Sequence, residues 1–436
     1  MASDAMDKIA SLCKRRGFVF QSSEVYGGIN ACWDYGPAGV ELKRNVKELW
    51  WQELTQLRDD IEGLDSAILM HPRVWHASGH VEGFTDPMVD CRVCKARFRA
   101  DQLEDAVCPK TKKPVLPECA PNLTEPRAFN LMFKTFMGPV EEDSSVVYLR
   151  PETAQGIYVN FQNVLSPSRQ KIPFGIAQIG KAFRNEISPG NFIFRSREFE
   201  QMEMQFFVPP GDALTWFEYW RDQRMAWYEG IGISPTHLRF HEHGPAELAH
   251  YAKQAVDIEY EFPFGWKELE GIHNRTDFDL RRHMEHSGKD LSYFDQEANQ
   301  HYVPYIIETS AGADRTVLTV LVEAYAEEPE RVVLRFHPKV APVKAGIFPL
   351  VKRDGMPDRA AAIAADLRKH FRVFYDEKGA VGRRYRRQDE LGTPYCITVD
   401  SQTLADDTVT VRERDSMAQA RVPSEGLLAY FRERLG

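Results

Sequence analysis

The chain has 436 residues, of which 43% are hydrophobic and 27% charged, and 55 basic against 64 acidic side chains give it a formal net charge of −9. A chain of this length is expected to form two or three domains, each with a sizeable core. The composition excludes collagen-like, disulfide-scaffold and wholly disordered classes, and the acidic balance excludes a globally basic nucleic-acid coat but not a local basic face. No long apolar run predicts a transmembrane helix and no signal peptide is evident, so we expect a cytoplasmic protein without membrane contact.

The first predicted element is a helix over residues 38–54. Its apolar side chains recur at helical spacing and would give a surface suited to a homodimer contact. They are Leu42, Val46, Leu49, Trp50 and Trp51.

Residues 87–127 change character and are predicted to form an insertion, since they carry several prolines, a Lys-rich turn and four of the seven cysteines. The cysteines are Cys91, Cys94, Cys108 and Cys119. Four thiolates favour a tetrahedral site for a structural zinc ion. The first pair has the spacing of a zinc knuckle, whereas the second pair is too far apart for one. One of the histidines nearby in the sequence, His71, His76 or His80, could replace one cysteine as a ligand. Reduced thiols without a metal are the other alternative.

Residues 173–208 are predicted to form two strands around a Pro-Gly turn. Because side chains alternate between the faces of a strand, Arg184 and Glu186 share one face of the first strand, and Phe199 and Glu203 share one face of the second. The loop between them adds positive charge. This pattern favours a floor on which a ligand lies, and the alternative is an exposed, salt-bridged hairpin.

Residues 303–326 are predicted to form a strand that runs into an apolar helix. Glu308 and Ser310 share one strand face, and Asp314 is placed to cap the helix. Arg315 then lies in the first helical turn, where a cation is unfavourable unless an anion is near. This position indicates a bound anion, and a surface salt bridge is the alternative.

From residue 341 to residue 436, strand-like and helical runs alternate and predict a small α/β domain. Within it, residues 383–387 form a dense basic run around one tyrosine. Arginine and tyrosine can stack on unpaired bases while neighbouring arginines neutralise phosphate, so the run predicts tRNA contact. The arginines are Arg383, Arg384, Arg386 and Arg387. A solvated, charged turn is the alternative.

Three segments resemble the motifs of class II aminoacyl-tRNA synthetases. They are residues 33–43 for motif 1, residues 183–186 with 197–199 for motif 2, and residues 312–315 for motif 3. Four further segments are more specific, and their sequences are similar to those of the homodimeric glycyl-tRNA synthetases. They are residues 22–28, 150–156, 192–195 and 274–280. Residues 382–394 resemble the anticodon-binding domain that the glycyl, threonyl, prolyl and histidyl enzymes share.

The resemblance covers nearly the whole chain apart from the Cys-bearing insertion. It implies an α+β protein in which residues 1–340 form a class II catalytic domain built on an antiparallel sheet, and residues 341–436 form the α/β anticodon-binding domain. It also implies a homodimeric glycine–tRNA ligase. Such an enzyme activates glycine with ATP, as its Mg²⁺ complex, to glycyl-adenylate and pyrophosphate, and transfers glycine to the 3′ end of tRNA(Gly).

The resemblance implies roles for the ATP-binding positions. Arg184 would bridge the amino-acid carboxylate and the α-phosphate, which its five donors in a fixed fork allow. Phe199 would stack under adenine, and Glu186 would accept from the adenine amino group. Arg315 and Arg195 would hold the β- and γ-phosphates of a bent ATP. Arg184, Glu186 and Arg315 form the catalytic set, which acts by positioning and charge stabilisation.

Acidic residues would bind the metal and the amino acid. Glu270 and Glu308 are candidate Mg²⁺ ligands within the ATP site, and Glu308 alternatively faces the substrate amine. Glu152, Glu203, Glu308 and Ser310 match the amine-binding positions of the family, with Arg184 on the carboxylate. Glu152 as a helix or turn cap is the alternative. Because every competing amino acid is larger than glycine, steric exclusion can suffice without an editing domain.

Two other functions compete with this interpretation. A synthetase-derived binding protein that has lost catalysis has no reason to keep the full ATP-binding set. A sister class II enzyme for threonine, proline or serine is also disfavoured. The Cys/His zinc set of a threonyl pocket and the N-terminal coiled coil of the seryl enzymes are not found in the sequence.

Overall fold

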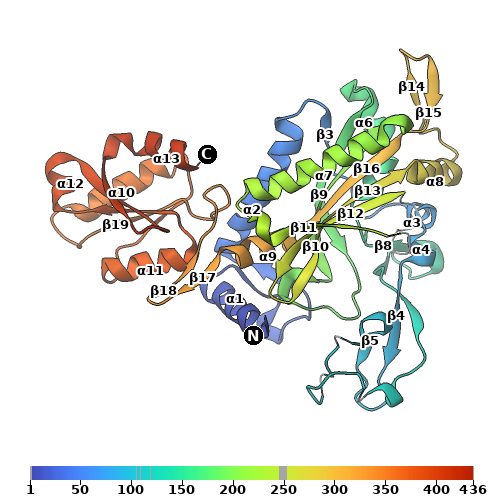
Figure 1. Cartoon of the computed structure of the whole chain (residues 1–436), viewed down its shortest axis with the longest axis horizontal. Helices are drawn as coiled ribbons and strands as arrows, with labels where there is room; N and C mark the ends of the chain where they lie inside the picture. Colours follow the sequence, from blue (N-terminus) through green and yellow to red (C-terminus); the bar gives the residue numbers. More distant parts are fainter. Residues whose placement is uncertain (1, 105, 109, 118, 245–252, 436) are drawn as a thin grey trace.

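A computed structural model describes residues 2–104, 106–108, 110–117, 119–244 and 253–435 of the chain. Figure 1 shows a large body that carries the N-terminal and central segments, a small sheet that projects from it, and a C-terminal body at the opposite end of the long axis. Within the described residues, no helix combines the length and the apolar character that crossing a membrane requires.

A seven-stranded sheet forms the centre of the large body, in the order β11-β12-β13-β16-β10-β9-β3. Every neighbouring pair is antiparallel except β3 with β9. The strands are β3 (Ile61–Gly63), β9 (Phe174–Phe183), β10 (Glu198–Val208), β11 (Leu238–Glu242), β12 (Gln254–Phe262), β13 (Gly265–Thr276) and β16 (Tyr305–Gly312). The predicted α+β fold with an antiparallel catalytic sheet is confirmed.

One face of this sheet packs on helices and forms the main core. The helices are α2 (Pro37–Trp51), α7 (Ala213–Gly230) and α9 (Ala313–Ala324). Strand alternation sends Met202 and Met204 of β10 into this core. Leu42, Val46 and Trp50 of α2 are also fully buried in it. These three side chains therefore pack within their own chain, whereas Leu49 and Trp51 stay partly exposed, and the dimer contact expected for this helix stays a prediction.

The opposite face of the sheet carries polar side chains in its middle and a second apolar cluster at one end. Short helices belong to this side of the body. They are α3 (Pro72–Ala77), α4 (His80–Gly83), α5 (Ala154–Val159), α6 (Phe161–Ser168) and α8 (Phe278–Ser287). The polar middle of the face is left for a binding site.

The four cysteines of the insertion lie in segments that connect the strands of a projecting three-stranded sheet, whose order is β5-β4-β6. These strands are β4 (Thr85–Asp90), β5 (Arg97–Arg99) and β6 (Arg127–Asn130). Figure 1 shows this sheet reaching away from the large body, while β4 keeps it connected there. The remaining elements before the C-terminal body are α1 (Ala2–Arg16), β1 (Val19–Gln21), β2 (Trp33–Tyr35), β7 (Lys134–Phe136), β8 (Val146–Tyr148), β14 (Tyr293–Asp295), β15 (Gln300–Tyr302), β17 (Tyr325–Glu328) and β18 (Arg331–Leu334).

The C-terminal body has its own five-stranded sheet in the order β20-β19-β21-β22-β23 and its own apolar core. Its strands are β19 (Ala345–Pro349), β20 (Val373–Tyr375), β21 (Tyr395–Val399), β22 (Thr408–Glu413) and β23 (Gln419–Pro423). Its helices are α10 (Met356–Leu367), α11 (Val381–Leu391), α12 (Ser401–Asp406) and α13 (Leu427–Leu435). Buried Arg331 of β18 pairs with Asp389 of α11 at 3.1 Å, which joins the two bodies.

Candidate active site

A cavity of about 360 Å³ lies on the polar face of the large sheet, with walls from β10, β13, β16, the loop after β9 and the Cys-bearing insertion. It gathers nearly all the residues predicted for ATP and glycine. Those that line it are Glu152, Arg184, Glu186, Arg195, Phe199, Glu203, Glu308, Ser310 and Arg315. We name Arg184, Arg195 and Arg315 the arginine wall. We name Glu152, Glu203 and Glu308 the carboxylate pocket.

Arg184 lies between two aromatic rings at the start of the loop after β9. Its guanidinium carbon is 5.3 Å from the centroid of Phe84 and 5.4 Å from that of Phe199. Its Nε donates to the carbonyl oxygen of Pro151 at 3.0 Å, so the fork is oriented before any ligand binds. Glu186 is buried beside it, and its Oε2 has no hydrogen-bond partner among the described residues. An acceptor in that state calls for a donor from a ligand.

Arg315 forms an ion pair with Glu268 of β13 at 3.1 Å and lies 4.4 Å from the ring centroid of Phe194. The salt-bridge alternative for Arg315 is thus realised, but in the wall of the cavity. Arg315 also lowers the pKa of Glu268 against the opposing effect of burial. Sequence reasoning missed Glu268 and chose Glu270 on the same strand.

Glu270 lies on the wrong face of the sheet for ATP or Mg²⁺, and its predicted role is corrected here. Its fully buried carboxylate accepts from Arg224 of α7 at 2.7 Å. The register of β12 against β13 shifts at this point, so that residues 258 and 259 face 270 and 268 respectively. Such a bulge reverses the alternation of side chains, which turns Glu268 toward the cavity and Glu270 away from it.

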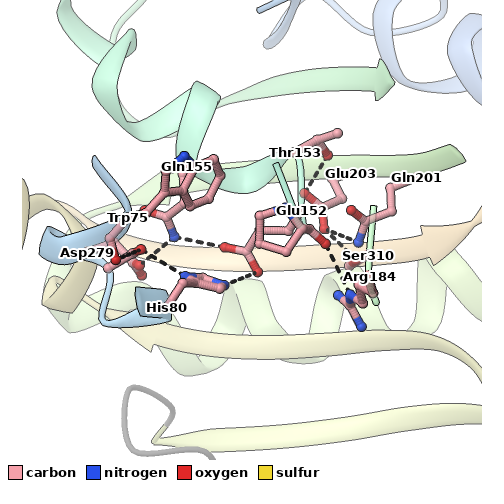
Figure 2. A network of polar contacts seen from close by, with 12 residues as sticks. Trp75, His80, Glu152, Thr153, Gln155, Arg184, Gln201, Glu203, Asp279 and Ser310 are labelled. Atoms are coloured by element: carbon pink, nitrogen blue, oxygen red, sulfur yellow. Dashed lines mark hydrogen bonds and ion pairs between the residues drawn. The ribbon is translucent and has the colours of Figure 1, made fainter. Parts of the chain in front are cut away.

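Glu203 lies at the centre of the carboxylate pocket and receives only neutral donors (Figure 2). The hydroxyls of Thr153 and Ser310 donate to it at 2.6 and 2.7 Å, and Nε2 of Gln201 donates at 2.9 Å. Within the described residues, Glu203 forms no ion pair. Burial, together with the charges of Glu308 and Glu152, raises the pKa of Glu203 to about 8.

The other two carboxylates are compensated by side chains of the chain itself. Glu152 accepts from Gln155 at 2.8 Å and lies 3.4 Å from Nε2 of His80 (Figure 2). Burial would raise the pKa of Glu152, but His80 and Arg275 hold it well below the usual value. It does not cap α5, since Thr153 holds the cap position.

The carboxylate of Glu308 lies 3.1 Å from Nη1 of Arg275 and 3.0 Å from Nδ1 of His273, and it accepts from Nε2 of Gln205 at 3.0 Å. Burial opposes these contacts, yet Arg275 and His273 hold the pKa of Glu308 at about 2. A carboxylate with this many partners from its own chain has little capacity left for either Mg²⁺ or a substrate amine. Of the three acids, Glu203 is the one that an incoming cation would compensate.

Sequence reasoning missed the residues that support the carboxylate pocket. Arg275 also pairs with Asp279 at 2.8 Å, and both stand in the segment at 274–280 that had been singled out for its wording. The alternation of β13 puts His273 and Arg275 on one face, which was a readable signal once the strand was assigned. His80 had no such signal, because it comes from a short helix distant in the sequence.

Two family descriptions match the chain: a tRNA synthetase class II core domain (G, H, P, S and T) over residues 135–325, and an anticodon binding domain over residues 341–434. The glycine–tRNA ligase of Treponema denticola is 59% identical, over 98% of this chain and 96% of its own length. That of Thermobifida fusca is 54% identical, over 99% and 98%. The chain belongs to the glycine–tRNA ligase family. A third member, from Clostridium acetobutylicum, is 53% identical over 99% of this chain and 98% of its own.

Membership of the glycine–tRNA ligase family confirms the resemblance seen in the sequence, including the class II core and the anticodon-binding domain. In this member of the family, the predicted tRNA-binding run lies on helix α11, not in a turn. Arg384 is buried and donates to backbone carbonyls, among them that of Pro349 at 2.6 Å. It therefore holds the domain together, and its predicted contact with RNA is corrected. The other three arginines line a second cavity of about 810 Å³ with Arg16 and Tyr385.

The four cysteines of the insertion come together. Cys91 contacts Cys94 and Cys119, and Cys108 contacts the same two thiols, so the sulfurs form a closed ring. Thiols in this arrangement suit zinc chemically. Even so, the described residues hold no group of three or more His, Cys, Asp or Glu side chains already arranged to hold a metal ion. The structure does not confirm zinc, which stays a prediction.

Proposed function

We propose that this chain activates glycine with ATP to glycyl-adenylate and pyrophosphate, and then transfers glycine to the 3′ end of tRNA(Gly). The observation that carries the proposal is the placement of the arginine wall and the carboxylate pocket in one cavity. A substrate with an ammonium, a carboxylate and a reacting phosphate finds complementary charge at each of its groups.

In the first step the ammonium of glycine pairs with Glu203, and its carboxylate points toward Arg184. A carboxylate oxygen attacks the α-phosphorus of ATP, and the bond from that phosphorus to the bridging oxygen of the β-phosphate breaks. Arg184 stabilises the charge that develops on the α-phosphate, while Arg195 and Arg315 hold the departing pyrophosphate. Catalysis then depends on positioning, without a covalent enzyme intermediate.

In this proposal the adenine ring stacks on Phe199, whose ring lines the cavity. The unpartnered oxygen of Glu186 accepts from the exocyclic amino group. Mg²⁺ would travel with the phosphates, and Glu268 is the carboxylate of β13 that lines the cavity and could reach it.

In the second step a ribose hydroxyl at the 3′ end of tRNA attacks the carbonyl carbon of the adenylate and AMP leaves. We assign the anticodon end of the tRNA to the C-terminal body, residues 341–436, where Arg383, Arg386 and Arg387 stay accessible. Residues 1–340 form the catalytic domain in this proposal. The cytoplasmic location stays a prediction.

A homodimer is also part of the proposal, and a surface other than that of α2 suits it as well. Val25 and Tyr26 are each 91% exposed in the short turn η1 (Glu24–Tyr26), and Ile29 beside them is 53% exposed. An apolar group of this kind at the surface is typical of a protein contact, and we assign it to a second copy of the chain.

The deciding experiment is amino-acid-dependent ATP–pyrophosphate exchange, with all twenty amino acids and Mg²⁺. Exchange with glycine alone would support both the reaction and the specificity. Exchange with a different amino acid would keep class II chemistry and refute the carboxylate pocket as a glycine site. No exchange from a folded sample would favour a binding protein that has lost catalysis.

A further inference from the structure

Arg99, at the end of β5 in the Cys-bearing insertion, lies in the wall of the active-site cavity. Its side chain is 17% exposed and forms two ion pairs, with Asp86 at 2.6 Å and with Asp101 at 2.7 Å. Asp86, on the neighbouring strand β4, lines the same cavity. The insertion is therefore part of the site, although none of its residues belongs to the synthetase motifs in the sequence.

The insertion also contacts the arginine wall directly. Nη1 of Arg195 donates to Oε1 of Gln102 at 3.0 Å, and Gln102 stands three positions after Arg99 in the short helical turn η3 (Ala100–Gln102). The same short segment thus holds one arginine of the wall and adds a fourth to it.

The arginines in this part of the cavity lie close enough to act on one another. Burial lowers the pKa of Arg195, and the positive charges of Arg99 and Arg315 lower it further, against the opposing charge of Glu186. Arginines that repel one another in a partly buried site are stabilised when a multiply charged anion binds among them. Asp86 and Asp101 pair with Arg99, and Glu268 pairs with Arg315, whereas Arg195 forms no ion pair within the described residues.

We propose that Arg99 is a fourth phosphate-binding residue, which contacts the β- or γ-phosphate of ATP from the insertion. The planar guanidinium has more N–H donors than its two carboxylate partners occupy. It can therefore donate to a phosphate oxygen and still keep one ion pair. The inference rests on the proposed nucleotide-binding role of the arginine wall. It assigns to the insertion a part in ATP affinity that its position outside the motifs does not suggest.

The test compares Arg99→Gln with Arg97→Gln. Arg97 lies two positions earlier on β5, is 65% exposed, and pairs with Asp90 outside the cavity. We expect Arg99→Gln to weaken ATP binding by about tenfold or more, the loss of a charge-assisted contact. Adenosine, which has no phosphate, should bind both variants and the parent chain equally. Arg99→Lys should recover part of the ATP affinity, and Arg97→Gln should match the parent.

Three outcomes would overturn the proposal. An unchanged ATP affinity in Arg99→Gln would show that Arg99 does not contact the phosphates. Equal loss of ATP and adenosine affinity would show that Arg99 only supports the fold of the wall. A defect confined to transfer onto tRNA, with normal exchange, would assign Arg99 to the RNA instead. The comparison of ATP with adenosine is made by equilibrium binding, so the first two outcomes do not depend on whether glycine-dependent exchange is observed.

Discussion

The ammonium of Lys43 lies 2.7 Å from Oδ1 of Asp314, and this buried ion pair joins helix α2 to the first turn of helix α9. The other oxygen of Asp314 accepts from the backbone nitrogen of Glu200 at 2.7 Å. Asp314 does not cap α9 as expected, because Gly312 holds the cap position and the carboxylate turns to Lys43. Arg315 follows directly, so the pair positions one arginine of the wall.

Replacing Lys43 with Met should destabilise the protein by about 3 to 5 kcal/mol, since it leaves Asp314 buried without its cation. Pyrophosphate exchange should fall as well, because Arg315 loses its anchor. Lys47→Met is the matched control: Lys47 lies one turn further along α2, is 25% exposed, and pairs with Glu200 alone. Lys47→Met should lower the free energy of unfolding by less than about 1 kcal/mol. Urea unfolding measures both, and equal losses would contradict the positioning role.

Arg184→Ala should reduce glycine-dependent exchange by a factor of about 100 or more, since it removes the donors proposed for the α-phosphate. The fold and tRNA binding should be largely intact, because Arg184 lines the cavity and forms no ion pair within the described residues. Lys181→Ala serves as the control, since Lys181 lies three positions earlier on β9 and its side chain is 42% exposed. Near-normal exchange by Arg184→Ala would refute the assigned role.

Glu203 should make stability depend on pH in an unusual direction. Its pKa is raised to about 8 by burial, so folding takes up a proton that the unfolded chain has already lost above its ordinary value of 4.5. The free energy of unfolding therefore falls as pH rises from about 4.5 to about 8 on account of this group. Glu203→Gln should match the parent near pH 4.5 and become more stable than it by on the order of 1 to 3 kcal/mol near pH 8.

Glu200→Gln provides the opposite sign on the same strand. Burial would raise the pKa of Glu200, but Lys43 lowers it to about 2, so its contribution to stability is present above about 4.5 and lost as pH falls toward 2. This variant should be less stable than the parent at neutral pH. Chemical denaturation from about pH 2 to 8.5 covers the pH range in which each group titrates and measures both variants. A Glu203→Gln difference that does not grow with pH would show that Glu203 is already ionised.

Glu270→Gln should affect stability, not nucleotide binding. It leaves buried Arg224 with a neutral partner, at a cost on the order of 3 kcal/mol. The KM for ATP and the Mg²⁺ dependence of exchange should stay near those of the parent. Glu268 is half-exposed and pairs with Arg315. Glu268→Gln should therefore change the KM for ATP and the Mg²⁺ dependence of exchange, and should leave stability near that of the parent. A changed Mg²⁺ dependence in a stable Glu270→Gln protein would restore the original assignment.

Zinc analysis of the purified chain decides the role of the thiol ring. Elemental analysis should find about one zinc ion per chain if all four thiolates bind it. Cys94→Ser should lose the metal, whereas Cys32→Ser, outside the insertion, should retain it. Removal of zinc by a chelator should lower thermal stability, because the metal binds the folded state. A metal-free chain of unchanged stability would establish four reduced thiols.

The sequence by itself determined the features that depend on near neighbours in the chain. Strand alternation correctly placed Phe199 and Glu203 on one face of a strand, and both line the cavity. The helical periodicity of residues 38–54 and the run of strand into helix at 303–326 also correspond to observed elements, α2 and β16 with α9. Together with the sequence motifs, these local patterns identified most of the residues that line the cavity.

Only the tertiary structure decided which residues of suitable chemistry face that cavity. A bulge in β13 turns Glu268, and not Glu270, toward the cavity. Packing against β19 buries Arg384. His80 and Arg99 entered the site from segments whose own sequence carries no sign of it. Register shifts, burial and ion pairs depend on partners far away in the chain, so local periodicity has no information about them.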